Sequence, residues 1–153
     1  PMKRAMRCDK MTIAALETIL RLYTDPDRLA EHIPTLRLLA RKQDDIQATA
    51  KRISPALDTV LDDRYAISLE QCQSQIGSGS LPTERLKSVA LVIRPTATKG
   101  IGTALKWLAT AFRALPMPVI GRIQDDAFWL DLRCLEAENE GAFTNQLTAL
   151  QIK

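Results

Sequence analysis

The sequence has 153 residues, of which 46% are hydrophobic and 25% charged. These proportions suit one globular domain and exclude disordered and fibrous classes, and no apolar run approaches the ~20 residues that a membrane-spanning helix needs. The net charge of +3 is too small to indicate a nucleic-acid-binding protein by itself. We therefore expect a soluble cytoplasmic protein.

The first predicted element is an amphipathic helix at residues 11–23, because apolar side chains recur there at spacings of three and four residues. These side chains are Ile13, Leu16, Leu20 and Tyr23. Asp9 or Thr12 would cap its N-terminus. A short helical turn at residues 28–32 follows, and Pro34 would end it.

A second helical region is expected at residues 43–62, where Ser54 and Pro55 interrupt the pattern. Because proline lacks a backbone N–H, we expect a kink or break, with Ser54 capping a new segment. Beyond this region the apolar period changes to two at residues 65–70, which predicts a strand with one buried face.

Residues 89–93 are apolar at every position and predict an inner strand, with residues 76–82 in the connection before it. The apolar stripe of residues 101–115 predicts a helix that ends before Pro116.

A hairpin is expected from residues 119–123 and 128–134, with the turn at 124–126. One face of its second strand would carry Phe128, Leu130, Leu132 and Cys134. The last predicted helix covers residues 138–150.

The predicted order is α-α-β-β-α-β-β-α, which favours an α+β fold. We expect a two-layer sandwich of a four-stranded sheet with helices on one face, preceded by N-terminal helices. The predicted division is a helical linker at residues 1–64, leading from a domain outside this chain, and an α+β domain at residues 65–153. Because the chain begins at Pro1 with a basic cluster, we expect a piece of a longer protein.

Arg4 and Arg7 are the first candidate site, because two guanidinium groups three residues apart can converge on one anion. The alternative is a pair of solvated arginines at a frayed terminus.

A second candidate is the loop Gly77, Ser78, Gly79 and Ser80, whose backbone and hydroxyl groups can approach a ligand. It lacks the lysine of a phosphate-binding P-loop, and Pro82 stands where a Rossmann fingerprint requires glycine. A plain connection between strands is the alternative.

The remaining reactive residue types give weaker signals. The cysteines, Cys8, Cys72 and Cys134, are widely spaced, so neither a disulfide framework nor a zinc motif is indicated. For His32, the only histidine, we expect a surface or packing role. The tryptophans, Trp107 and Trp129, are expected to pack in a core or interface rather than stack on bases, and the clustered carboxylates to be solvated.

Five segments carry a resemblance that covers nearly the whole chain. They are KRAMRCDKMT (3–12), IPTLRLL (33–39), SQIGSGSLP (74–82), PVIGRI (118–123) and WLDLRCL (129–135). In this order they resemble the C-terminal part of the bacterial selenocysteine synthase family, the L-seryl-tRNA(Sec) selenium transferases.

The resemblance implies the small C-terminal domain of a pyridoxal-phosphate enzyme with the aspartate-aminotransferase fold type. Such an enzyme converts seryl-tRNA(Sec) to selenocysteinyl-tRNA(Sec) with selenophosphate. The family's Schiff-base lysine belongs to a segment that does not occur here, so Lys10 is not a candidate and these residues alone should be inactive.

Two residue assignments follow from the resemblance. Arg4 and Arg7 match the family's Arg-x-x-Arg, which holds the anionic selenium donor. The loop at residues 77–80 is expected to border the active site. The resemblance also implies a homo-oligomer, built as a ring of dimers, in which other parts of the chain hold most of the tRNA.

Two alternatives remain at this point. A related pyridoxal-phosphate lyase would share the fold but not the tRNA substrate. A stand-alone oligomerisation or RNA-binding module would use the basic N-terminus to dock an acidic partner, and salt-sensitive binding would indicate it.

Overall fold

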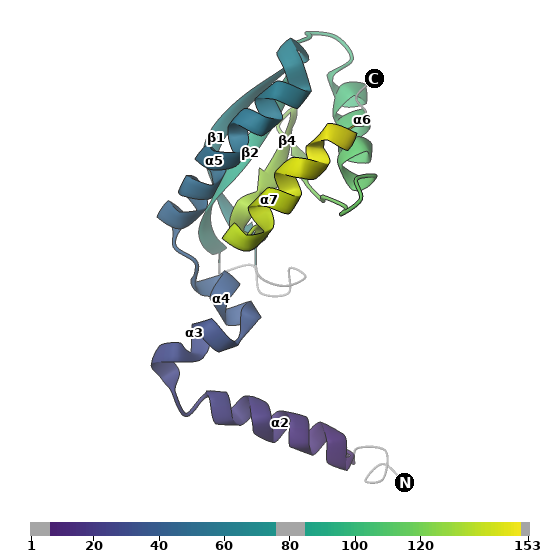
Figure 1. The fold of residues 1–153 in the computed structure, drawn as a ribbon. Helices are drawn as coiled ribbons and strands as arrows, with labels where there is room; N and C mark the ends of the chain where they lie inside the picture. The colour runs from purple at the N-terminus through teal and green to yellow at the C-terminus, as the bar shows by residue number, and fades with distance from the viewer. Residues whose placement is uncertain (1–6, 76–84, 151–153) are drawn as a thin grey trace. The chain divides into compact units, whose positions relative to one another are not determined.

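The computed structural model describes residues 7–75 and 85–150 (Figure 1). The helices are α2 (Lys10–Leu22), α3 (Leu29–His32), α4 (Pro34–Ala40), α5 (Gln43–Leu61), α6 (Ile101–Arg113) and α7 (Ala137–Gln146). The strands are β1 (Tyr65–Gln75), β2 (Arg85–Pro95), β3 (Arg122–Gln124) and β4 (Ala127–Asp131). The chain divides into two compact units, Pro1–Ala40 and Arg41–Lys153. None of the described helices combines the length and the apolar character needed to cross a membrane.

The first unit is helical, as predicted, and α2 lies within one residue of its predicted bounds. The Asp9 carboxylate accepts a hydrogen bond of 2.7 Å from the Thr12 backbone N–H, which confirms Asp9 as the N-cap. Pro34 has a different effect from the one expected. It ends the short helix α3 but begins α4, because the first position of a helix needs no N–H and suits the fixed φ of proline.

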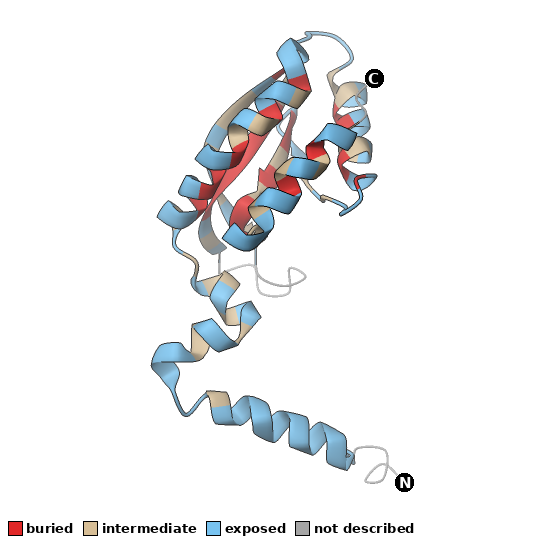
Figure 2. Cartoon of the chain, viewed as in Figure 1, coloured by how far each residue is buried: buried red, intermediate tan, exposed pale blue. Residues whose placement is uncertain are grey.

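The second unit is the predicted two-layer α+β sandwich. Its sheet is antiparallel with the order β1-β2-β4-β3, so β2 is the inner strand that its apolar sequence predicted. The buried residues gather where α5, α6 and α7 meet one face of the sheet (Figure 2). The largest fully buried side chains include Phe112, Phe128, Ile46, Leu57, Leu91 and Leu108.

Helix α5 runs through Pro55 without the predicted break. Buried residues lie on both sides of the proline, Ile53 before it and Leu57 after it, and both contact the core. Pro55 itself is exposed, so water can hydrogen-bond the carbonyl that loses its helical partner. The Ser54 hydroxyl interacts with Asp58 at 3.4 Å instead of capping a new helix.

The predicted hairpin is present as β3 and β4, with shorter strands than expected. Asp125 and Asp126 form its turn with φ values of 50° and 52°, a left-handed pair that suits the twist of a two-residue hairpin. Phe128 and Leu130 face the core as predicted. The prediction is wrong for Cys134, which is exposed, because the strand gives way to a short 3-10 helix, Leu132–Cys134.

Candidate functional site

Of the predicted arginine pair, Arg7 lies in the described chain and Arg4 lies outside the described residues. Arg7 is exposed and precedes the N-cap of α2 by two residues. The backbone hydrogen bond from Thr12 lowers the pKa of the Asp9 carboxyl, so this N-terminus already carries its own negative charge. The binding of an anion at this end of the chain would therefore depend on the arginines rather than on the helix dipole.

The second predicted site, Gly77, Ser78, Gly79 and Ser80, lies outside the described residues. Its place in the topology is nevertheless set by the strands that flank it. Gln75 and Arg85 are the last paired residues of antiparallel β1 and β2, so the segment joins the ends of two neighbouring strands.

The described histidine and cysteines do not form a metal site. Within residues 7–75 and 85–150, no group of three His, Cys, Asp or Glu side chains is placed to hold a metal ion. His32 is exposed at the end of α3, in keeping with its predicted surface role. Cys8 and Cys134 are exposed, and burial raises the pKa of the partly buried Cys72 thiol, which keeps it protonated at neutral pH.

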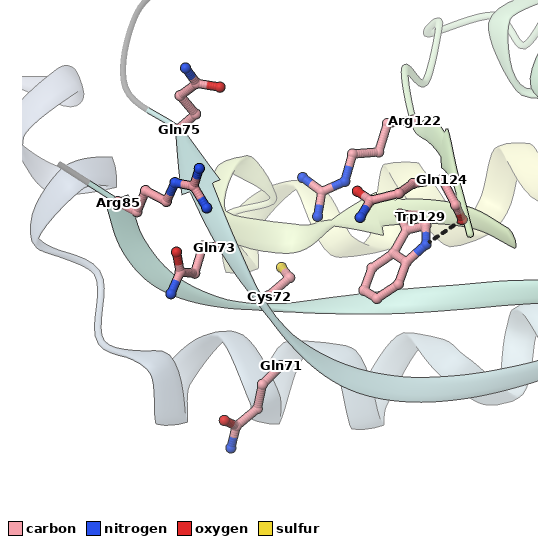
Figure 3. A pocket seen from close by; sticks show the side chains of 8 residues that line it. All are labelled: Gln71, Cys72, Gln73, Gln75, Arg85, Arg122, Gln124 and Trp129. Atoms are coloured by element: carbon pink, nitrogen blue, oxygen red, sulfur yellow. Dashed lines mark hydrogen bonds between the residues drawn. The ribbon is translucent and has the colours of Figure 1, made fainter. Parts of the chain in front are cut away.

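Side chains from all four strands line a cavity of about 540 Å³ (Figure 3). It is lined by Gln71, Cys72, Gln73, Gln75, Arg85, Arg122, Gln124 and Trp129. The Arg122 guanidinium carbon lies 5.5 Å from the centroid of the Trp129 ring, a cation–π distance. The Trp129 indole N–H donates to the Gln124 carbonyl at 3.0 Å, which fixes the ring at the cavity wall.

A polar cluster joins three of the same strands. Asp131 accepts hydrogen bonds of 2.6 Å from the hydroxyl groups of Ser74 and Ser88, which belong to β1 and β2. The buried Arg133 donates to the Ser74 hydroxyl at 3.2 Å and to the carbonyls of Arg41 and Lys87. The cluster ties β1, β2 and β4 together and leaves the Asp131 carboxylate fully engaged.

This cavity was not predicted from the sequence. Trp129 packs, half-buried, against the buried cluster of Ala90, Val92 and Ala127, in keeping with the packing role expected for it. Trp107 lies on α6 with 46% of its surface exposed, outside the core. The signal that could have found the cavity is the alternation in β3 and β4, which places Arg122 directly opposite Trp129.

Comparison with known proteins decides the family. Residues 1–136 match the family described as L-seryl-tRNA selenium transferase. The chain belongs to this family. The resemblance drawn from the five segments is thereby confirmed, over most of the length of the chain.

Individual selenium transferases agree with the family match. The chain is 50% identical over 150 residues, 98% of its length, to a protein of Methylocella silvestris named L-seryl-tRNA(Sec) selenium transferase. It is 56% identical over 138 residues, 90% of its length, to the protein of that name from Klebsiella pneumoniae. It spans only 31% and 29% of the lengths of these two relatives.

The described residues do not fit pyridoxal phosphate. A Schiff-base lysine must be held against the cofactor ring inside a cavity. Every described lysine is exposed, and none of them lines the cavity on the sheet. These are Lys10, Lys42, Lys51, Lys87, Lys99 and Lys106. The described residues therefore include no lysine placed to form the Schiff base.

Proposed function

We propose that this chain is the C-terminal part of an enzyme that converts L-seryl-tRNA(Sec) to selenocysteinyl-tRNA(Sec), with selenophosphate as the selenium donor. The observation that carries the proposal is the family match over residues 1–136. The names of the two relatives favour this transferase over a related lyase and over a stand-alone module.

The proposed division of labour follows from what the described residues lack. Pyridoxal phosphate is held by a part of the full-length cytoplasmic enzyme outside these 153 residues, because no described lysine is placed to hold it. Arg4 and Arg7 bind the selenophosphate anion, since two guanidinium groups match its oxygens with paired hydrogen bonds. Their task is to orient the donor towards the carbon that accepts selenium.

The proposal is tested by supplying seryl-tRNA(Sec) and selenophosphate to the full-length protein and to the 153-residue chain. We expect the full-length protein to form selenocysteinyl-tRNA(Sec), and the 153-residue chain to form none. Selenium transfer by the short chain would contradict the division of labour, and failure of the full-length protein would contradict the proposed activity.

We also propose that the full-length enzyme is a homo-oligomer and that α2 contributes to a contact between subunits. Support comes from the apolar stripe of α2, none of whose residues is buried. Leu16 and Leu20 are each 56% exposed, and together with Ile13 they line a groove bordered by Glu17 and Arg21. Exposed apolar stripes of this kind mark association surfaces.

Substituting Leu16→Asp in the full-length enzyme is expected to lower the mass measured by light scattering, because the charge would lie in the subunit contact. Thr18→Gln, a polar exchange on the same helix, should leave the mass unchanged. If Leu16→Asp lowers the melting temperature without changing the mass, α2 packs within its own subunit and the proposed contact is wrong.

A further inference from the structure

The sheet of the second unit has two edges of very different length. With the strand order β1-β2-β4-β3, these edges are β1 and β3. Strand β3 has three residues and carries the cation Arg122, and short or charged edge strands resist pairing with another strand. Strand β1 has eleven residues, and all of them pair with β2 in one unbroken antiparallel register. The long edge of this sheet is therefore β1.

The outer side of β1 presents its backbone without a partner strand among the described residues. Because the hydrogen bonds of an antiparallel pair alternate between the two sides of a strand, every second residue of β1 directs its N–H and C=O away from β2. Within residues 7–75 and 85–150, no backbone hydrogen bond reaches these groups. Strand β1 also contains no proline, lysine or bulge, which commonly protect an edge. It can therefore accept a further strand along its length.

The side chains of β1 suit a second copy of the same strand. A two-fold contact requires a surface that is complementary to itself. Glu70 is the one charged residue of β1, and it is paired with Arg94 of β2, so the strand offers no net charge to an acidic or a basic partner. Gln71, Gln73 and Gln75 are exposed, and a glutamine amide can both donate to and accept from another glutamine.

We propose that β1 pairs with the β1 strand of a second copy of this chain, in an antiparallel two-fold contact that joins the two sheets into one. The partner is thus another subunit of the proposed homo-oligomer, and the inference rests on that oligomer. It adds a contact on the second unit, separate from the contact assigned to α2.

The register of this contact follows from charge and from apolar exposure. Pairing all eleven residues would centre the two-fold axis on Glu70 and set two carboxylates opposite each other, which is destabilising. A centre at Leu69 or at Gln71 removes this repulsion and keeps each face of the joined sheet continuous. Leu69 lies opposite Leu91 on the helix-covered face and is 36% exposed, so pairing it with its own copy would extend the core. The contact is therefore centred on Leu69, and each Glu70 faces the Ser68 position of the other copy.

The test places single cysteines on β1 of the full-length enzyme. Directly opposite residues of antiparallel strands have Cα atoms about 4.5 to 5.5 Å apart, which is within the range of a disulfide. Leu69→Cys would face its own copy, so mild oxidation should join most subunits into pairs on a non-reducing gel. The parent enzyme gives the background from its natural cysteines. Cys72 should add nothing to it, because this register sets Cys72 opposite Ala66.

Gln73→Cys is the matched control for the cross-link. Gln73 is exposed and lies on the same face of the same strand as Leu69. In the proposed register it faces the Tyr65 position of the other copy, so the two Gln73 positions lie roughly 26 Å apart along the strands. We expect no cross-linking above the parent. If Leu69→Cys is cross-linked no more than Gln73→Cys, the proposed contact is wrong.

Gln71→Lys, combined with Leu69→Cys, gives a second measurement. In the proposed register Gln71 faces the partly buried Ile67 of the other copy, and a lysine there would have to lose water from its charge. We therefore expect the cross-link to be lost. Thr110→Lys places the same charge on the exposed side of α6, which packs on β2, β3 and β4, and should leave the cross-link unchanged. A cross-link that persists with Gln71→Lys does not arise from strand pairing, which overturns the proposal.

Two further readouts separate this inference from the proposed function. A parent enzyme that transfers selenium and is oligomeric by light scattering, but whose Leu69→Cys variant forms no cross-link, overturns only the β1 contact. Slow amide hydrogen exchange of β1 without a cross-link would identify another segment of the full-length chain as its partner, which also overturns it. A monomeric parent enzyme contradicts both the homo-oligomer and the β1 contact, whether or not it transfers selenium.

Discussion

Replacing Arg4 and Arg7 with alanine in the full-length enzyme is expected to slow selenium transfer from selenophosphate by about 100-fold or more. Loss of the hydroxyl group from seryl-tRNA(Sec) should change much less, because that step does not involve the selenium donor. The physical reason is that two guanidinium groups both attract the anion and fix its orientation. Water molecules in their place would neither attract nor orient the anion as well. Parallel assays of selenium incorporation and of serine consumption on the tRNA measure the two steps.

Lys10→Ala provides the control for this experiment. Lys10 is an exposed cation at the first position of α2, three residues from Arg7. Replacing it with alanine removes one positive charge, as does the replacement of either arginine. We expect nearly parental selenium transfer from this variant. Equal slowing of both steps in the arginine variants, or equal effects of Lys10→Ala and Arg7→Ala, would show that the arginines do not hold the selenium donor.

Gly121→Ala is expected to destabilise the second unit by about 2 to 3 kcal/mol, at the upper end of the usual cost of overpacking. A Cβ atom at Gly121 would lie 2.5 Å from the ring of Phe128 and 2.7 Å from the backbone carbonyl oxygen of Trp129. The Phe128 ring cannot yield easily, because it is fully buried and packs 5.4 Å from the ring of Phe112. Urea denaturation of the 153-residue chain measures the change.

Gly141→Ala is the matched control for the glycine substitution. Gly141 lies inside α7, and a Cβ there would meet no atom within 4 Å. Alanine has the higher helix propensity, so this variant should gain roughly 0.5 to 1 kcal/mol of stability. A Gly121→Ala protein as stable as the parent would mean that the hairpin can move away from Phe128, contrary to the packing described.

The fold was predictable where one periodic pattern was dominant. The three- and four-residue spacing of α6 and the apolar run of β2 give their types, because burial on one side or on both sides dictates the pattern. The same spacing gives the type of α2, although none of its residues is buried in the structure. The end of β1 was missed, since residues 71–75 are polar apart from Cys72 and are held in the strand by backbone pairing with β2. Pro55 was misread because core contacts on both sides of it outweigh the local loss of one hydrogen bond.

The candidate sites were predictable to a smaller extent. Arg4 and Arg7 are neighbours in sequence, so a motif could identify them. The residues that line the cavity come from distant segments, and Arg85 and Trp129 share it only because β2 and β4 are neighbours in the sheet. Sequence spacing carries no information about such a juxtaposition unless the strand order is already known.

We propose above that this chain is part of a pyridoxal-phosphate enzyme whose cofactor lysine lies outside these 153 residues. The most direct test of this proposal is borohydride reduction of the full-length protein with bound pyridoxal phosphate, followed by peptide mass mapping of the modified lysine. We expect one modified lysine, in a peptide outside the present sequence. A specific adduct on Lys10 or another lysine of this chain, or no adduct at all, would contradict it.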